Sequence, residues 1–195
     1  MTWVRGAAIR PVPAYAVVPH ATLSSVEEEL ARDEDAAQGE LDVAFRRFEE
    51  TQPNLANKMT DVLGKPLDEV ALALGYFLSI AVWLGFDRAF GRRLALVSED
   101  ALSATEAALA LEEELRASHA DEPLELDDVV AMEQPAVLAF INEHVDAALT
   151  PHGDREDVDV EDVHGVYRAI LVLTLALSHA VQPEPGAPGT HELLA

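Results

Sequence analysis

Histidine and carboxylate residues gather in one stretch of the sequence, between positions 143 and 164. Imidazole and carboxylate groups together suit zinc, manganese or iron. No two histidines in the stretch are four residues apart, so it lacks the spacing of a helical metal motif. Asp157, Asp159 and Glu161 imitate the first positions of a calcium loop, but the sixth position is not glycine and the twelfth is Arg168. A solvated acidic loop is therefore the simpler interpretation, and a metal site remains an alternative with these candidate ligands: His144, His152, His164, Asp157 and Asp159.

Arg168 interrupts an apolar stretch near the end of the chain. A buried charge is costly unless it is paired with an opposite charge. Asp162 and Glu161 lie about two helical turns earlier, and an acid from another helix would serve equally well. We expect a buried ion pair between Arg168 and Asp162. The alternatives are a side chain that reaches out to solvent and an arginine that binds a ligand.

A basic cluster stands out in this acidic sequence: Arg88, Arg92 and Arg93. Arg88 and Arg92 are four residues apart, so they would share one face of a helix. The simpler interpretation is that the cluster docks against the protein's own acidic helices. Otherwise it marks a contact with a partner or with a second copy of the chain.

Two glutamines each precede a proline at the start of a short apolar stretch, TQPNLANKM at 51–59 and EQPAVLAFI at 133–141. Proline restricts the preceding residue to extended conformations, so each glutamine turns away from the axis of the helix that follows. The simpler interpretation is that Gln52 and Gln134 satisfy a helix end or an adjacent backbone group. The functional alternative is that they line a symmetric groove that binds a partner.

The other residue types give no recognised catalytic pattern. The sequence contains no glycine-rich phosphate loop and no G-x-S-x-G nucleophile elbow. It also contains no cysteine, which excludes disulfides and thiolate ligands or nucleophiles and fits a reducing compartment. We therefore favour a cytoplasmic protein that is not an enzyme and holds no cofactor.

The net charge of −23 is concentrated in three blocks, with −7 over residues 25–50, −11 over 98–135 and −7 over 143–162. The most apolar stretches are nearly neutral. A field of this sign repels nucleic acid and anionic lipid and attracts a basic partner, which argues against direct binding of a nucleic-acid backbone. Solubility, or a salt-adapted or GC-rich host, would also account for the acidity, because arginine outnumbers lysine by 11 to 2.

Helical signals recur along the chain, and no convincing strand alternation is present. Ser24 and Ser25 each precede a glutamate by three residues, which predicts a capping box and a helix that runs to about residue 50 with a bend near Gly39. Pro53 predicts the start of a short helix, and Ser98 predicts the N-cap of another. Long apolar helices are expected at about 69–93 and 161–181, a turn of helix at 127–132, and a further helix after Pro135. The helix after Ser98 is expected to turn an apolar stripe inward, with Leu102 and Leu109 beside it: Ala101, Ala104, Ala108, Leu111 and Leu115.

The two Gln-Pro stretches lie 82 residues apart, and their similarity continues beyond them. Met59 aligns with Ile141, and an acidic pair and a long apolar helix follow in both copies. Val70 aligns with Val163 when the acidic loop of the second copy has 11 extra residues. The predicted fold is an all-α bundle of about six to seven helices with two central apolar helices and a pseudo-two-fold internal duplication. Repeat 1 covers about 51–93, a connector helix 98–118, and repeat 2 about 133–181.

A single helical domain is expected over 25–181. Residues 1–24 contain three prolines, which predict an extended N-terminal arm and argue against a signal peptide. Residues 182–195 are expected to form a mobile tail. Residues 70–86 carry no charge and reach the lower limit for a membrane span. A helix that is apolar all round can equally be buried among other helices, and we favour that arrangement in a soluble protein.

These features favour a non-catalytic, acidic adaptor that binds another protein through its helix surfaces, either as a monomer or as a homodimer. Its candidate partner-binding residues are Arg88, Arg92, Arg93, Gln52 and Gln134. One alternative is an acidic decoy that occupies a basic or nucleic-acid-binding surface. The other is a metal- or small-ligand-dependent enzyme or sensor that uses the region between His144 and His164.

Overall fold

The computed structural model describes residues 10–30, 34–117, 133–150 and 158–185. These residues form an all-α bundle of seven α-helices and two short 3-10 helices, as predicted, and contain no β-strand. The predicted turn at 127–132 lies outside the described residues. The elements are η1 (Ala14–Ala16), α1 (His20–Leu30), α2 (Glu34–Thr51), α3 (Pro53–Leu63), α4 (Glu69–Phe90), η2 (Gly91–Arg93), α5 (Glu99–Ala117), α7 (Pro135–Leu149) and α8 (Val160–Ala180).

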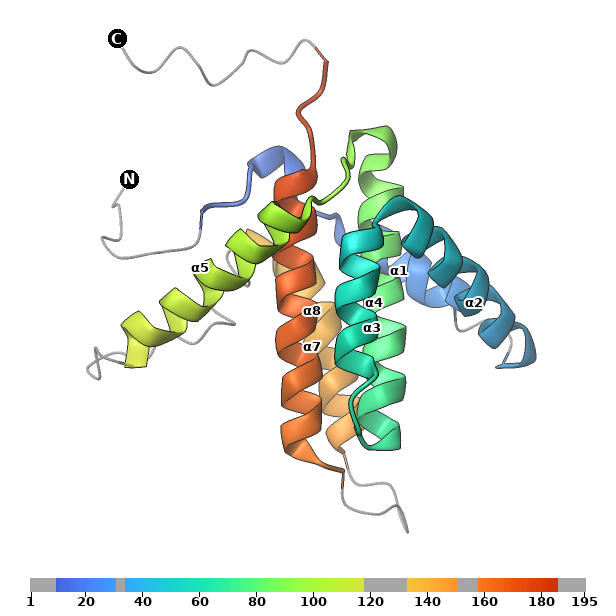
Figure 1. The fold of residues 1–195 in the computed structure, drawn as a ribbon. Coiled ribbons are helices and arrows are strands. Elements are labelled where there is room, and N and C mark those ends of the chain that lie inside the picture. Colours follow the sequence, from blue (N-terminus) through green and yellow to red (C-terminus); the bar gives the residue numbers. More distant parts are fainter. Residues whose placement is uncertain (1–9, 31–33, 118–132, 151–157, 186–195) are drawn as a thin grey trace, which may run out of the picture.

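Helices α4 and α8 lie side by side at the centre of the bundle and run in the same direction (Figure 1). Their N-terminal ends meet. The side chain of Asp68 caps α4, and its second carboxylate oxygen accepts a hydrogen bond from Asp159 N at 3.1 Å. Asp68 N in turn donates to Asp162 Oδ2 at 2.8 Å. Because two capped helix starts share these bonds, the two central helices are fixed in a parallel arrangement.

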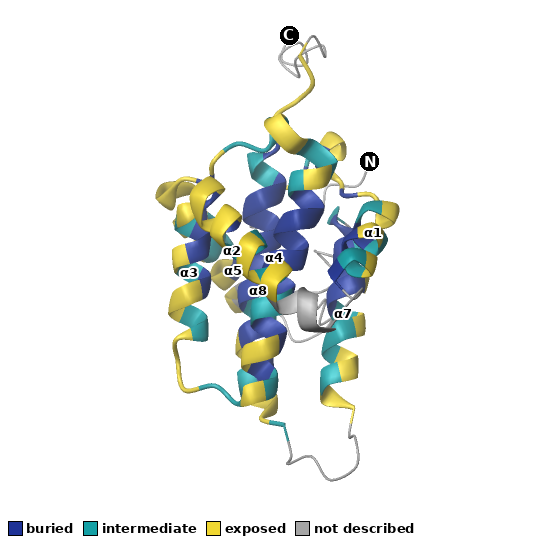
Figure 2. Cartoon of the chain, turned by 90° about the vertical axis from the view of Figure 1, so that its right-hand side faces the viewer, coloured by how far each residue is buried: buried dark blue, intermediate teal, exposed yellow. Residues whose placement is uncertain are grey.

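The outer helices cover this central pair. Helix α1 packs on α4 and α7, α2 packs on α3 and α4, and α5 crosses α8 near its C-terminal end (Figure 1). Buried residues concentrate on the central helices (Figure 2). Trp83, Phe48 and Phe86 are among the largest side chains with essentially no exposed surface. Burial of a large apolar side chain contributes roughly 1.5–3 kcal/mol, so these two apolar helices form the core of the fold.

Both central helices are long and apolar enough to cross a membrane. Core helices of soluble proteins meet the same criterion, because a helix covered on all sides needs no polar face. In this bundle, 67% of the most apolar window of α4 and 61% of that of α8 are buried inside the protein.

The first helices differ from the prediction in two ways. Helix α1 begins at His20, so Ser24 lies inside the helix, where its hydroxyl donates to the His20 carbonyl at 3.3 Å. The prediction of a capping box at Ser24 or Ser25 is therefore wrong. Pro19 precedes the helix and its carbonyl accepts from Thr22 N, which closes the first turn upstream of the serines. In addition, α1 and α2 are separate helices that contact each other, where one helix was expected, and Gly39 lies within α2.

The N-terminal arm is part of the core rather than a segment on the surface. Val12, Ala16 and Val18 are 8%, 0% and 1% exposed, and the 3-10 helix η1 interrupts the extended backbone. The arm ends at Pro19, not at residue 24. At the other end of the chain, Gln182 N donates to Arg93 O at 2.7 Å, and Leu94 pairs with Val181 in an isolated bridge. Most of the predicted tail lies outside the described residues.

Helix α5 has the predicted N-cap, because Ala101 N donates to Ser98 Oγ at 3.2 Å. Its predicted inner face is correct only in part. Leu102 and Leu109 are buried, whereas Ala101 and Ala104 are exposed and Leu111 is 48% exposed. Because α5 crosses α8 at an angle, only part of its length touches the bundle (Figure 1). The apolar stripe that the spacing predicts therefore borders open space.

Candidate functional site

Gln52 is the N-cap residue of α3 and is 2% exposed. Its side-chain amide makes two hydrogen bonds to the segment that follows η2. Nε2 donates to Ala95 O at 2.9 Å, and Oε1 accepts from Val97 N at 2.9 Å. The amide therefore satisfies one carbonyl and one N–H group of an extended segment that would otherwise lack partners.

Gln134 holds the equivalent position before α7 and is fully buried. Its Nε2 donates to Ala16 O at 2.7 Å, and its Oε1 accepts from Val18 N at 3.0 Å. Nε2 also donates to the hydroxyl of Ser178 in α8 at 2.9 Å. Each glutamine amide thus joins the carbonyl of one residue to the N–H group two positions later, in a segment that is remote in the sequence.

The local sequence explains why the two glutamines behave alike. Pro53 and Pro135 occupy the first helical positions, and each turns the preceding residue away from the helix. The backbone angles φ and ψ are −136° and 58° at Gln52, and −138° and 63° at Gln134. The interpretation that each satisfies backbone groups is supported, although those groups are distant rather than adjacent. The alternative that they line a partner-binding groove is wrong, because both side chains are buried and bonded. The internal duplication itself stays a prediction.

The candidate metal ligands do not come together in the described part of the chain. His152 and Asp157 lie outside the described residues. His144 packs its ring against Phe77 and Phe140, with Nδ1 2.9 Å from the Phe140 carbonyl oxygen and Nε2 3.7 Å from a carboxylate oxygen of Glu27. Asp159 caps α8, and His164 is exposed. Within the described ranges, no group of three histidine and carboxylate side chains could hold a metal ion.

Arg168 is half-buried rather than buried, on the side of α8 that faces α3. It lines a groove of about 330 Å³ together with Lys58 and Lys65, the two lysines of the chain. Asp162 lines the same groove, and its carboxylate accepts from the backbone of Asp68. The predicted ion pair between Arg168 and Asp162 stays a prediction.

The basic cluster at the end of α4 contacts the protein's own elements. Arg88 pairs with Glu29 of α1 at 2.5 Å. Arg93 donates to the carbonyls of Gln182 and Tyr15, at 2.9 and 3.2 Å, and pairs with Glu184 at 3.3 Å. Its guanidinium also lies over the rings of Tyr15 and Phe90. Arg88 and Arg93 therefore join parts of the bundle, and Arg92 is exposed.

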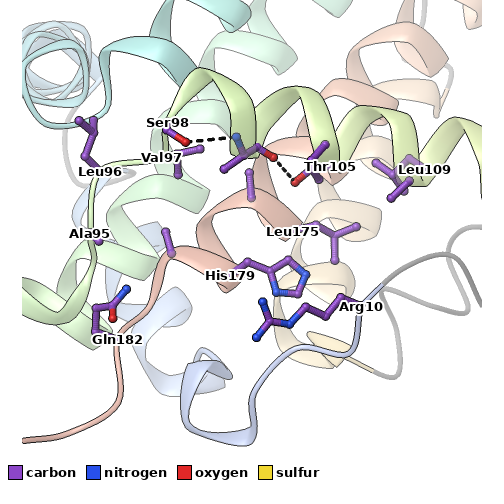
Figure 3. Close-up of a pocket in the computed structure, with 15 residues that line it drawn as sticks. Arg10, Ala95, Leu96, Val97, Ser98, Thr105, Leu109, Leu175, His179 and Gln182 are labelled. Atoms are coloured by element: carbon purple, nitrogen blue, oxygen red, sulfur yellow. Dashed lines mark hydrogen bonds between the residues drawn. The ribbon is translucent and has the colours of Figure 1, made fainter.

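A pocket that no sequence feature predicted lies between α5 and α8 (Figure 3). Its volume is about 390 Å³, in the range of small-molecule sites. Arg10 and the imidazole of His179 line it together with Ser98, Thr105 and Gln182. The rest of its wall is apolar: Ala95, Leu96, Val97, Ala101, Ala104, Ala108, Leu109, Leu175, Ala176 and Ala180. Within the described ranges, no carboxylate residue lines this pocket.

His179 is the unusual residue of this pocket. Its Nδ1 is buried and has no hydrogen-bond partner among the described residues. Burial lowers the pKa of His179 below its ordinary value of 6.5, and the charge of Arg10 lowers it further. The charge of Glu133 and a backbone hydrogen bond with Arg10 oppose this effect but do not outweigh it, and the Glu133 carboxylate also accepts from Val12 N at 2.7 Å. The imidazole is therefore neutral at neutral pH.

No protein-family model matches the sequence, and no curated protein or solved structure matches it significantly.

Proposed function

We propose that this all-α bundle is a non-catalytic interaction protein whose outer helices bind a partner with a basic surface. The observation that supports the proposal is the separation of charge in the fold. The two central helices are buried and largely uncharged, whereas exposed carboxylates project from the outer helices. Those outside any ion pair among the described residues include Glu28, Glu40, Glu49, Glu50, Asp61, Glu99, Asp100, Glu114, Glu143 and Asp146.

Several cations of the chain are engaged within the fold. Arg47 pairs with Asp87 at 2.5 Å, Lys58 pairs with Glu106, and the pairs of Arg88 and Arg93 are described above. These pairs neutralise a minority of the 36 acidic residues. The outer surface therefore keeps a strongly negative field, which attracts a positively charged protein and accelerates its association.

The outer face of α2 is the surface that we assign to this partner. Val43 is 60% exposed there, which makes it one of the most exposed large apolar side chains in the described part of the molecule. Glu40 precedes it by about one helical turn, and Glu50 follows it by about two. An apolar centre with a charged rim is the usual arrangement of a protein–protein interface. The partner is expected to present basic side chains around an apolar contact.

The proposal can be tested by affinity capture of partners from a lysate of the source organism. The wild-type protein is compared with two variants that have lost the same number of negative charges. The α2 variant carries Glu40→Gln, Glu49→Gln and Glu50→Gln. The control variant carries Glu99→Gln, Asp100→Asn and Glu143→Gln, which remove the same charge from α5 and α7. We expect one partner to be retained by the wild-type and control proteins, to be lost by the α2 variant, and to dissociate as salt is raised.

Two results would contradict the proposal. One is a partner that binds all three proteins equally, and the other is a protein that retains no specific partner at low salt. If the retained partner is a nucleic-acid-binding protein that DNA displaces, the acidic-decoy alternative gains support. That distinction concerns the partner's identity and leaves the assigned surface unchanged.

A further inference from the structure

The pocket between α5 and α8 exists because two similar helix packings differ in side-chain size. Leu23 follows the anchored residue Val18 by five positions, and Leu102 follows Val97 by the same number. On the α1 side, Leu23 fits directly over Gly85 of α4, where a Cβ atom would lie 2.7 Å from its Cδ2 atom. On the α5 side, alanines of both helices leave about 390 Å³ open.

The charge at this pocket is opposite to that of the molecule. None of the acidic residues that the structure describes lines the pocket, and Arg10 supplies a guanidinium group. Among the described residues, Arg10 has no ion-pair partner. An unpaired guanidinium beside an apolar cavity is suited to a carboxylate, which it can bind through two parallel hydrogen bonds.

His179 supplies a second polar group close to Arg10 (Figure 3). A neutral imidazole carries one N–H group, and its tautomer is set by the partner that it meets. A backbone hydrogen bond with Arg10 engages the ring, while the buried Nδ1 has no partner among the described residues and is open to a polar group of a ligand. A buried polar atom without a hydrogen bond is rare in native proteins and calls for a ligand, a water or an ion.

We infer that this pocket binds a small organic carboxylate with an apolar body. The carboxylate pairs with Arg10 next to His179, and the apolar body fills the space between Leu109, Leu175 and the alanines. Both parts are needed. The negative field of the protein repels a bare anion elsewhere on its surface, and an uncharged apolar molecule leaves the guanidinium unpaired. This inference does not depend on the partner surface of α2.

Calorimetric titration with octanoate tests the inference. Two further probes serve as controls: 1-octanol has the apolar chain without the charge, and inorganic phosphate has the charge without the chain. We expect octanoate to bind, and 1-octanol and phosphate to bind at least about 10-fold more weakly, since a charge-assisted hydrogen bond is commonly worth a factor of 10 or more. Arg10→Gln should weaken octanoate binding about 10- to 100-fold. Arg92→Gln removes the same charge from an exposed site and should leave binding unchanged.

A second pair of variants tests the position of the apolar body. Ala104→Leu places a larger side chain in the pocket and should abolish octanoate binding, whereas Ala107→Leu, on an exposed part of the same helix, should not. If Ala104→Leu fails to fold, Arg10→Gln decides alone. The inference is overturned if octanoate does not bind, if 1-octanol binds as tightly, or if Arg10→Gln behaves like Arg92→Gln.

Discussion

Gln52 and Gln134 each cross between two parts of the described chain, a first half at residues 10–93 and a second half at residues 94–185, to anchor a segment of the other half. Gln52 binds Ala95 and Val97, and Gln134 binds Ala16 and Val18. The two anchored segments are 79 residues apart, and each leads into an outer helix, α5 or α1. The two halves therefore hold each other, because the carbonyl and N–H groups that each glutamine binds belong to the other half.

Two glycines of the central helices should respond in opposite directions to substitution by alanine. A Cβ atom at Gly75 would lie 2.6 Å from Leu63 Cδ2 and 2.9 Å from Val166 Cγ1. A Cβ atom at Gly165 would point into open space. We expect Gly75→Ala to lower the free energy of unfolding by about 1–3 kcal/mol through overpacking. Gly165→Ala should raise it by about 0.5–1 kcal/mol, because alanine favours the helix. Urea denaturation measures both, and a stabilising Gly75→Ala would show that α4 and α8 are less closely packed.

The shared cap at the start of the central helices should be a point of sensitivity. Asp68 accepts from Val70 N and Ala71 N, and also from Asp159 N. Asp68→Ala removes all three bonds and should cost at least about 1–2 kcal/mol of unfolding free energy. Asp61→Ala, at an exposed position of α3, is the control and should stay within about 0.5 kcal/mol of the wild type. Equal stabilities of the two variants in thermal or urea unfolding would contradict the cap.

The stability of the protein should fall at high pH through Tyr76. Partial burial, followed by its hydrogen bond to Asp42 at 3.1 Å, raises the pKa of Tyr76 from 10.0 to about 12. The folded protein therefore favours the protonated phenol. This contribution is fully present below pH 10 and is lost as pH rises through about 12. Tyr76→Phe should remove this alkaline component, which unfolding experiments at several pH values would detect. A spectrophotometric titration in which every tyrosine ionises near pH 10 would contradict the prediction.

His179 should make the protein less stable in acid. Its pKa is lowered by burial and then by Arg10, so the folded protein favours the neutral imidazole and the unfolded chain binds the proton more readily. The contribution is present above about pH 6.5 and is lost as pH falls toward the lower pKa of the folded state. NMR titration of the imidazole should give a pKa below 6.5, and His179→Gln should reduce the acid sensitivity. His20→Gln, at an exposed position, should not.

Local signals in the sequence predicted most of the helices. Pro53, Pro135, Ser98 and Asp68 each mark a helix start through an effect that acts within one turn, and the structure has helices beginning at these places. The same kind of signal failed at Ser24, because Pro19 and the apolar residues after it compete for the helix start. Local preference is therefore reliable only where no second start signal lies nearby.

The tertiary role of the glutamines and the pocket could not be predicted in the same way. Gln52 and Gln134 bind backbone atoms, which every residue possesses, so no side chain in the sequence identifies the target. The pocket forms where α5 and α8 cross, because the small alanine side chains of both helices do not fill the space between them. The sequence does not specify where the two helices cross. The burial of Val12 and Val18 escaped prediction because so short a segment shows no apolar period.

Hydrogen exchange at two backbone amides tests the mutual anchoring of the halves most directly. Val18 N and Val97 N each donate to a buried glutamine oxygen, so in the wild-type protein both should exchange as slowly as amides of the central helices. In Gln52→Ala, Val97 should lose about 10- to 100-fold of its protection relative to α4, while Val18 keeps its own. Gln134→Ala should produce the reverse. Fast exchange of both amides in the wild type, or equal losses in both variants, would contradict the anchoring.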